Sequence, residues 1–383
     1  MATVRVLQII VGGKNFNGVA SFLYQYYQHM NHEKVHFDFF VVRENALEAR
    51  KEDPVFQDSK FYVLNAVKKN NKTDHIKMMR GLDKLLSEEH FDIVHINTMS
   101  VGAHVPLIHV CRKHHIQTII SHSHNEYSNN MRFSKLLAHK LFMSYINKNA
   151  DGLFACSLKA GKCLFGEKGV RMGKFRVINN AIDPDQFGFS PAKRKMMREQ
   201  FNVSDSMIII GQIGRLSRQK NQGFGIDVFH DFHNKMPDSQ FWIVGQGEDQ
   251  EKLETQVEKN GLSDSVIFMG QRNDVNDLLT AMDILLFPSR WEGLSVAAIE
   301  AQSTGIPILA SDKITPETAV TDLVQFLPLD AGASAWADQL SELAGQNRDR
   351  HGRREDIERS GFSIADAAKQ LQEYYCSRRE KAN

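Results

Sequence analysis

Short apolar runs alternate with longer segments of mixed polarity along the first half of the chain. The runs are rich in β-branched and aromatic residues, and most are apolar on both faces, as parallel strands covered by helices must be. They predict strands at 4–11, 36–42, 91–97, 116–121, 151–157 and 175–180. Between them, the pattern predicts helices that include 20–30, 76–90 and 133–149.

The same alternation restarts in the second half, after a less regular stretch. It predicts strands at 207–214, 240–245, 265–270, 283–289 and 306–311. Strand–helix alternation in both halves predicts an α/β fold with two doubly wound, Rossmann-like domains, and a length of 383 residues favours two domains over one. The turn residues of NNAIDPD place the linker near 179–185, and a final helix near 363–379 fits either domain.

The polar or glycine-rich tails of these strands are where a ligand site is expected, because open α/β sheets bind ligands at the carboxyl ends of their strands. These tails are GGKNFNG at 12–18, SHSHNE at 121–126, GRLSRQKN at 214–221, GQGE at 245–248, GQRND at 270–274 and SRWEGLS at 289–295.

Glu292 and Glu300 stand eight positions apart in the stretch SRWEGLSVAAIEAQSTGIPILAS. Glu292 lies in the turn into a helix that stops near Gly305, and the free N–H groups at a helix start attract an anion. At 1.5 Å per residue, eight residues span about 12 Å along the helix axis. This spacing suits an elongated ligand with an anionic middle and hydroxyl-rich ends, such as a nucleoside diphosphate sugar.

The plainer interpretation of this stretch is a helix with one capping acid and one incidental acid. Glu300 argues against it, because a carboxylate between AAI and AQ on an apolar helix is costly without partners.

Two further tails carry groups that bind anions. In GRLSRQKN, Arg215 and Lys220 are candidates to converge on one anion; the alternative is an ordinary loop with solvated cations. GGKNFNG follows the first strand but is not a dinucleotide fingerprint, and its glycines either let the backbone approach a ligand or make a turn.

The tail SHSHNE holds His122 and His124 after a buried strand. We expect the two side chains to point to opposite sides, one towards a ligand and the other into packing, so a zinc pair is not expected. The alternative is that both are packed or surface histidines.

Charge is spread unevenly, although the net charge is only +1. Residues 1–180 carry 25 basic and 15 acidic side chains, and residues 101–180 alone carry 12 basic and 3 acidic. This basic region is either a solvated face or a surface for an anionic partner such as a phospholipid membrane or a lipid-linked phosphate. Thirteen of the 16 histidines also lie in the first half, so mild acid would strengthen the asymmetry.

Composition indicates in which compartment of the cell the protein is expected. No apolar run is long enough to cross a membrane, and the N-terminus reads as a strand without a signal sequence. The four cysteines fit no metal-binding pattern. We therefore expect a cytoplasmic protein, peripheral at the inner face of the membrane if the basic region meets lipid.

Several of these segments together resemble the retaining GT-B glycosyltransferases of family four. The segments are EGLSVAAIE preceded by PSRW and followed by AQSTGIPILAS, with GRLSRQKN, VGQGEDQEKLE, SHSHN, FACS and NNAIDPDQF. HSHN with EAQSTGIPILASD is most similar to bacterial enzymes that build exopolysaccharide or capsular repeat units. The resemblance covers most of the chain.

The resemblance implies two Rossmann-like domains facing a cleft, with the last helix crossing back to the first domain. The N-terminal domain, 1–182 plus 363–383, would bind the acceptor, and the C-terminal domain, 183–362, would bind the donor. The donor is a nucleotide sugar, with UDP the usual nucleotide, and neither a metal nor another cofactor is expected. The acceptor is a glycan or a lipid-diphosphate-linked saccharide, and no nucleic acid partner is implied.

Site roles follow from the same resemblance. The residues implied in catalysis are His124, beside the reacting centre, Arg215 and Lys220, on the diphosphate, and Glu292, on the donor sugar. Those implied in donor binding are Gly13, Gly18, Gly214, Gly245, Gln271, Arg272, Gly293, Leu294, Ser295 and Glu300. Glu300 would take the ribose hydroxyls, and the loop with Gln271 and Arg272 would frame the base. Glycines 13 and 18 would approach phosphate and acceptor.

The first glycine loop departs from the pattern of many relatives, since Asn17 and Ala20 replace a glycine and a glutamate, and Ser295 stands where proline is common. The sequence predicts transfer of a hexose or N-acetylhexosamine to a polysaccharide precursor. The alternatives are a sugar-nucleotide epimerase of the same fold and a non-catalytic nucleotide-sugar-binding subunit, since fold alone does not choose among them.

Overall fold

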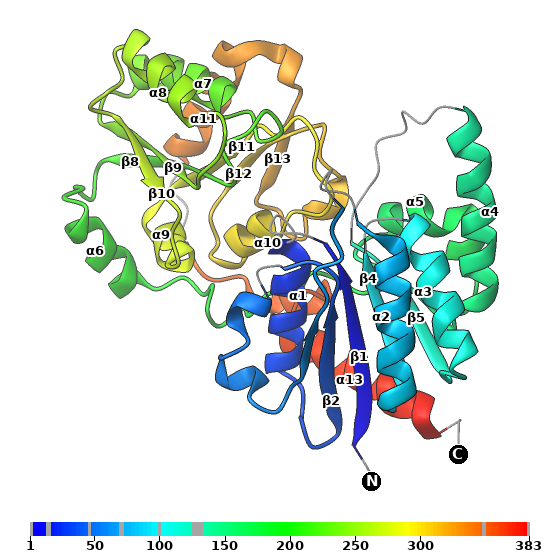
Figure 1. Cartoon of the computed structure of the whole chain (residues 1–383). Coiled ribbons are helices and arrows are strands. Elements are labelled where there is room, and N and C mark those ends of the chain that lie inside the picture. Colours follow the sequence, from blue (N-terminus) through cyan, green and yellow to red (C-terminus); the bar gives the residue numbers. More distant parts are fainter. Residues whose placement is uncertain are drawn as a thin grey trace. The chain divides into compact units, whose positions relative to one another are not determined.

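The computed structural model describes residues 3–12, 17–44, 47–68, 73–98, 101–124, 133–346 and 350–380. Its contacts divide the chain into two compact units, which Figure 1 colours along the sequence. Unit 1 comprises Met1–Ala181 and Ile364–Asn383, and unit 2 comprises Ile182–Ser363. Each unit has its own parallel sheet and its own apolar core.

Unit 1 is built on a seven-stranded sheet of order β3-β2-β1-β4-β5-β6-β7, in which every paired neighbour is parallel. The strands are β1 (Val4–Val11), β2 (Val35–Val41), β3 (Phe61–Val63), β4 (Ile93–Thr98), β5 (Thr118–Ser123), β6 (Gly152–Ala155) and β7 (Phe175–Val177). The helices are α1 (Asn17–Gln28), α2 (His75–Glu88), α3 (Val101–Lys113), α4 (Phe133–Asn149), α5 (Leu158–Val170) and α13 (Ile364–Glu380).

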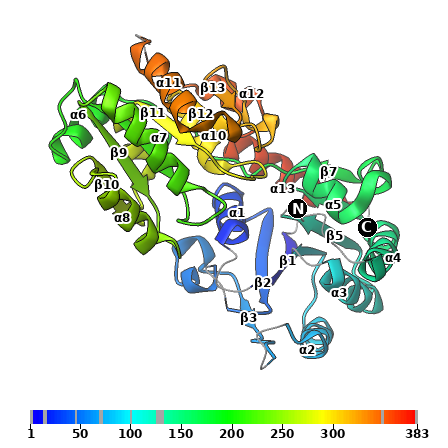
Figure 2. The same cartoon turned by 90° about the horizontal axis from the view of Figure 1, so that it is seen from above.

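Both faces of this sheet are covered. Along β1, Leu7 and Ile9 belong to one apolar cluster, while Val6 and Ile10 belong to the other, because successive side chains of a strand point to opposite faces. Figure 2 shows α2 on one face and α1 with α13 on the other. The final helix, which the sequence left with either domain, therefore packs in unit 1.

Unit 2 has a six-stranded parallel sheet of order β10-β9-β8-β11-β12-β13. The strands are β8 (Ile208–Ile213), β9 (Ser239–Val244), β10 (Val266–Gly270), β11 (Ile284–Phe287), β12 (Ile308–Ser311) and β13 (Val324–Leu327). The helices are α6 (Pro191–Gln200), α7 (Gln222–Lys235), α8 (Gln250–Lys259), α9 (Val275–Ala281), α10 (Val296–Ser303), α11 (Gly332–Gly345) and α12 (Arg354–Arg359).

The two parallel sheets confirm the predicted α/β class with two doubly wound sheets. The sequence pattern missed β3 and β13, which are short, partly buried strands at sheet edges. Helix α3, which is not among the helices named from the sequence, contains Pro106 in its interior. Within the described residues, no helix is both long enough and apolar enough to span a bilayer.

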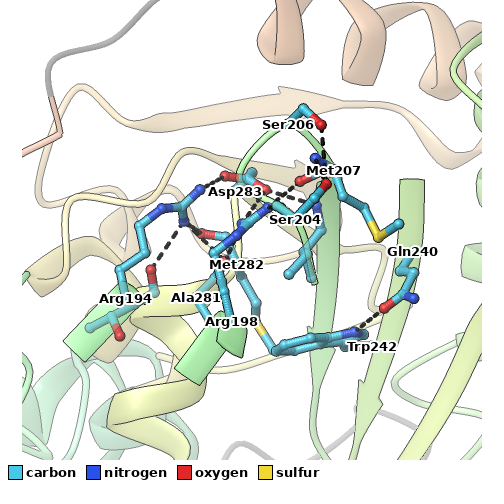
Figure 3. Close-up of polar contacts among 12 residues, drawn as sticks. Arg194, Arg198, Ser204, Ser206, Met207, Gln240, Trp242, Ala281, Met282 and Asp283 are labelled. Carbon is cyan, nitrogen blue, oxygen red and sulfur yellow. Dashed lines mark hydrogen bonds and ion pairs between the residues drawn. The ribbon is translucent and has the colours of Figure 1, made fainter. Parts of the chain in front are cut away.

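A buried ionic cluster supports the amino end of the unit 2 sheet (Figure 3). The last carbonyl groups around the end of α9, residues 279–282, accept hydrogen bonds from Arg194, Arg198 and Arg350. The last carbonyls of a helix lack an N–H donor within the helix, so the three guanidinium groups act as their hydrogen-bond donors. Asp283 pairs with Arg194 at 2.5 Å and Arg198 at 3.2 Å, and accepts from the Ile209 N–H at the start of β8.

Because Arg198 is 1% exposed, replacing it by methionine removes one of the two ion-pair partners of Asp283 and a buried donor to the carbonyls of Ser204, Met207 and Ala281. Arg198→Met should lower the free energy of unfolding of unit 2 by about 3 kcal/mol. All three tryptophans, Trp242, Trp291 and Trp336, lie in unit 2, so urea unfolding followed by tryptophan emission measures this unit.

Lys195→Met on the same helix is the matched control, because it breaks only an exposed pair with Glu199 at 3.9 Å. It should cost less than about 0.5 kcal/mol. Equal urea midpoints for the two variants would contradict the structural role given to Arg198.

Candidate functional site

The predicted donor-site residues of unit 2 sit in loops that leave the carboxyl ends of four neighbouring strands, β10, β9, β8 and β11. The loops after β8 and β9 touch closely. A Cβ on Gly245 would lie 2.1 Å from the carbonyl oxygen of Gly214, and Gly245 has φ +138°. Gly214, with φ +145°, likewise leaves room for the side chain of Lys220, whose Cε would lie 2.8 Å from an added Cβ. Glycine is therefore required at both positions.

Lys220 and Glu292 form the centre of this site. Lys220 Nζ lies 2.8 Å from Glu292 Oε1, and the two side chains are only 17% and 11% exposed. The contact is an ion pair whose angles do not make it a hydrogen bond, because Glu292 Oε1 has no hydrogen-bond partner among the described residues. Lys220 Nζ also lies 4.9 Å from the centre of the Phe287 ring.

Polar contacts that the sequence analysis missed tie the loop after β8 to the loop after β11. Asn221, in the left-handed conformation with φ +60°, donates from Nδ2 to the carbonyl of Pro288. Its Oδ1 accepts from Arg290 Nε, and Gln219 exchanges hydrogen bonds with the backbone of Arg290 and Trp291. These contacts hold Lys220 against Glu292. The available signal was an asparagine directly before a helix, since asparagine tolerates this conformation.

The other predicted cations are held elsewhere. Arg215 is exposed and donates to Glu248 at 2.9 Å, and Glu248 was not predicted. Arg272 pairs with Asp274 within its own loop at 2.6 Å, which raises the pKa of the guanidinium. Arg215 and Lys220 therefore contact different carboxylates, and Gln271 lies beside Arg272 in the loop after β10.

The start of helix α10 leaves its backbone N–H groups open. The helix begins at Val296, and Ser295 stands at the N-cap position without a side-chain cap hydrogen bond. Gly293 and Leu294 are partly exposed in the turn before it. Uncapped N–H groups at a helix start carry a partial positive charge, so this turn can bind an anion.

Only the segment from Val296 onward is helical, which corrects the estimate of about 12 Å between the two glutamates. Glu292 instead forms an isolated parallel bridge with Ile314, beside β12. The two carboxylates are therefore not related by helical rise across their whole separation.

Glu300 lies within α10 and has no side-chain hydrogen bond or ion pair to any residue in the described ranges. Burial raises the pKa of its carboxyl to about 7, because an ionised carboxylate loses hydration there without gaining a partner. The group is consequently poised between its neutral and charged forms near neutral pH.

In unit 1, His124 follows β5, and its Nε2 lies 2.8 Å from Asn97 Oδ1. The expectation that His122 and His124 point to opposite sides was wrong, since their ring centres are 3.9 Å apart. Residues two apart in an extended chain share a face. Burial lowers the pKa of His124 to about 3 and that of His122 well below its usual range.

The first loop predicted from the sequence holds two of the glycines expected to bind the donor, Gly13 and Gly18. Gly18 lies in α1 with open space around its Cα, so no steric contact requires glycine there. Gly13 lies outside the described residues. No cluster of three or more His, Cys, Asp or Glu side chains that could hold a metal occurs in the described part of the chain.

Two family models match consecutive parts of the chain. "Glycosyltransferase Family 4" matches residues 16–186, and "Glycosyl transferases group 1" matches residues 193–359. The boundary between the two matches falls close to the junction of the two structural units at Ala181 and Ile182.

Known proteins are similar over much of the chain. The chain is 25% identical over 346 residues to the putative glycosyltransferase EpsF of Bacillus subtilis, which covers 90% of this chain and 88% of that one. It is 28% identical over 242 residues to the UDP-Gal:alpha-D-GlcNAc-diphosphoundecaprenol alpha-1,3-galactosyltransferase of Escherichia coli and spans 62% of its length.

Among solved structures, Anabaena HepE in complex with UDP matches with a TM-score of 0.72 and 18% identity over 99% of this chain and 98% of that one. A glycosyltransferase from Rickettsia africae matches with a TM-score of 0.76 and 16% identity over 99% of both chains.

Two doubly wound parallel sheets on one chain, matched over their whole length by such structures, define the GT-B fold class. The protein belongs to the family four glycosyltransferases of this class, which confirms the resemblance that the sequence motifs carried.

The raised pKa of Glu300 predicts a pH-dependent stability. The folded state holds a proton up to about pH 7, whereas the unfolded carboxyl releases it near 4.5. Ionisation therefore costs folded stability as pH rises through this window, and the cost is absent below it. Glu300→Gln should be more stable than the parent protein by about 1–3 kcal/mol at pH 8 and nearly equal to it at pH 5, in urea unfolding without nucleotide.

Glu251→Gln, on an exposed position of α8, is the matched control and should give no such pH-dependent gain. A constant difference between Glu300→Gln and the parent protein from pH 5 to pH 8 would rule out the poised carboxyl.

Proposed function

We propose that this protein is a retaining, metal-independent glycosyltransferase that moves a hexose or N-acetylhexosamine from a UDP-sugar to a glycan or lipid-diphosphate-linked acceptor in exopolysaccharide or capsule synthesis. The observation that carries the proposal is the desolvated Lys220–Glu292 pair at the carboxyl end of the unit 2 sheet. It places a cation for a diphosphate and a carboxylate for sugar hydroxyls in contact, near the uncapped start of α10.

In the proposed reaction, the donor diphosphate takes over Lys220 and lies against the N–H groups at the start of α10. These groups stabilise the charge that grows on the leaving diphosphate, and this electrostatic effect is the largest contribution to catalysis. Glu292, released from Lys220, then accepts hydrogen bonds from the donor sugar, and Glu300 accepts from the ribose. His124 lies beside the reacting sugar.

Retention follows in this proposal from attack on the face that the diphosphate leaves. Glu292 is committed to Lys220 or to the sugar, and Glu300 is half protonated near neutral pH. Neither is suited to act as a covalent nucleophile, so a leaving phosphate oxygen takes the proton of the acceptor hydroxyl.

Relatives support UDP as the donor nucleotide. Structures of HepE hold UDP and UDP-glucose, and the E. coli relative is named for UDP-Gal. That relative is also named for a diphosphoundecaprenol-linked acceptor, and other relatives are named for lipopolysaccharide core and O-antigen synthesis. We therefore place this protein in the assembly of a cell-surface polysaccharide.

A basic groove supports a membrane-linked acceptor. The groove, of about 930 Å³, lies between α4 and α5. Its apolar lining includes Met143 and Phe165, and Lys140, Lys148 and Lys168 line it without a carboxylate in ion-pair distance among the described residues. On α4, Leu141 is 64% exposed. Cations beside exposed apolar groups complement an anionic phospholipid surface.

The donor site is tested by thermal shift with UDP, GDP, UDP-Glc, UDP-Gal, UDP-GlcNAc, UDP-GalNAc and GDP-Man, each with and without EDTA. UDP should stabilise the protein equally in both conditions. Lys220→Ala should weaken UDP binding at least about 10-fold, because it removes the cation that faces the diphosphate. Glu292→Gln should bind UDP at least as tightly as the parent protein, because Lys220 loses its competing partner, yet turn over about 100-fold more slowly.

Arg218→Ala, exposed in the same loop, is the matched control and should change neither quantity. Near-normal turnover in both Lys220→Ala and Glu292→Gln would reject the site. Incubation of each UDP-sugar without acceptor separates the alternatives, since an epimerase converts the sugar and a non-catalytic subunit binds the nucleotide without turnover.

The membrane partner is tested by flotation with liposomes. The protein should float with vesicles that contain anionic phospholipid, less with neutral vesicles, and less at high salt. The triple variant Lys140→Glu, Lys148→Glu, Lys168→Glu should lose this preference, because its charge reversal repels the anionic surface.

A control triple variant makes the same change in net charge at exposed helix positions of unit 2, with Lys195→Glu, Lys252→Glu and Lys259→Glu. This variant should still float with anionic vesicles. Equal loss in both triple variants would show that only net charge matters and would remove the groove from the proposal.

A further inference from the structure

A chain of buried polar side chains in unit 1 reaches His124 from the last helix. Gln8 on β1, His95 and Asn97 on β4, His122 on β5 and Tyr375 on α13 are all 0% exposed. The strands are neighbours in the sheet, in the order β1-β4-β5. Burying so many hydrogen-bonding groups is costly unless they satisfy one another, and their contacts form two connected branches that both begin at Tyr375.

The first branch runs through the two amides. Asn97 Nδ2 lies 3.3 Å from the backbone carbonyl of His95, which can only accept, and this contact identifies the Nδ2 end of the Asn97 amide. Nδ2 also donates to Gln8 Oε1 at 2.9 Å, and Gln8 Nε2 donates to the Tyr375 hydroxyl at 3.4 Å. Asn97 Oδ1 is therefore left to accept from His124 Nε2 at 2.8 Å, so Nε2 carries the proton.

The second branch runs through the imidazoles. Because the Tyr375 oxygen accepts from Gln8, its own hydrogen is free to go to His95 Nδ1 at 2.7 Å. His95 then carries its proton on Nε2 and donates to His122 Nδ1 at 3.1 Å. His122 in turn carries its proton on Nε2, and that N–H has no acceptor among the described residues.

The two branches meet again where the rings of His122 and His124 lie in contact, with 3.9 Å between their centres. All of these hydrogen bonds can form at the same time with the donors and acceptors given above and with neutral imidazole rings. Burial also lowers the pKa of His95 well below its usual range, which keeps the network uncharged. The other titratable groups around it are His104 on α3, with a pKa lowered to about 3 by burial, and Tyr26 on α1 and Tyr374 on α13, whose phenol pKa values burial raises.

We propose that Tyr375 is a positioning residue that helps to hold His124 in the Nε2–H tautomer, through the hydrogen bonds of Gln8 and Asn97. His124 Nδ1 is thereby left without a proton and can only accept a hydrogen bond. The last helix thus sets the hydrogen-bonding character of a residue beside the reacting sugar. This role in the reaction rests on the proposed function of His124, whereas the tautomer itself does not.

The tautomer is measured directly by long-range proton–nitrogen correlation NMR of the full-length protein labelled with [15N]histidine, with the His124 signals assigned by their loss in His124→Asn. In the parent protein at pH 7.5, His124 should show a protonated Nε2 and an unprotonated Nδ1. In Tyr375→Phe, both nitrogens of His124 should shift towards the average of the two tautomers, because Gln8 loses the partner that orients its amide and so holds Asn97 less firmly. Tyr374→Phe, on the neighbouring position, removes a hydroxyl that belongs to none of these hydrogen bonds and should leave the spectrum unchanged.

Gln8→Met separates the two branches and serves if Tyr375→Phe does not fold. It cuts the link between Tyr375 and Asn97 but keeps the hydrogen bond from Tyr375 to His95, so the signals of His124 should change while those of His95 stay as they are. In transfer assays, Tyr375→Phe and Gln8→Met should lower kcat about 10-fold with the donor KM changed less than about 2-fold, as expected when one oriented hydrogen bond is lost in the transition state.

A parent His124 with its proton on Nδ1, or unchanged His124 signals in both Tyr375→Phe and Gln8→Met, would overturn the proposal. A changed tautomer with kcat unchanged would overturn the catalytic consequence while leaving the network as described. If the protein transferred no sugar at all, the NMR comparison would still decide the positioning role, so failure of the proposed function is distinguishable from failure of this inference.

Discussion

The ion pair between Lys220 and Glu292 is the constraint on which the unit 2 site depends. Both groups are largely removed from water, so each loses hydration that its contact with the other helps to offset. The pair would be lost if the two loops separated, and the contacts of Asn221 and Arg290 keep them together. Those loops in turn are placed by the parallel pairing of β8 with β11, which brings their carboxyl ends side by side. The requirement for glycine at 214 and 245 is a further consequence of the same crowding.

Burial shifts the pKa values of titratable groups in both candidate sites. In unit 2, the side chain of Glu300 has no ion-pair or hydrogen-bond partner among the residues that the structure describes, and burial raises its pKa to about 7, so it is about half protonated at neutral pH. In unit 1, His95, His122 and His124 are held neutral by burial, with the pKa of each lowered. Neutral groups act by the direction of their hydrogen bonds rather than by charge. In unit 1, the hydrogen bonds of Tyr375, Gln8 and Asn97 set that direction for His124.

The sequence predicted what depends on local pattern. Alternating apolar runs gave the two sheets, and the motifs around Lys220 and Glu292 gave the family. It did not predict that these two residues pair with each other, because the contact is set by strand order and not by spacing along the chain. The sequence shows His95 and Asn97 as polar residues in the buried strand FDIVHIN. Their partner Tyr375 lies 280 residues from His95, and only the packing of α13 against the unit 1 sheet brings it to them. The short edge strands β3 and β13 were missed although their residues, FYV and VQFL, are mostly apolar, so apolar character alone does not identify a short edge strand.

The Lys220–Glu292 pair also couples binding of the diphosphate to binding of the sugar of the proposed donor. While Lys220 holds Glu292, the carboxylate is a poor acceptor for sugar hydroxyls, because its charge is already neutralised. A diphosphate that binds Lys220 releases Glu292, so binding of the anionic part should strengthen binding of the sugar part. Such coupling is reciprocal, and the sugar must favour diphosphate binding by the same factor. A site built in this way recognises the intact donor better than either fragment, and it holds its carboxylate neutralised by lysine until the donor arrives.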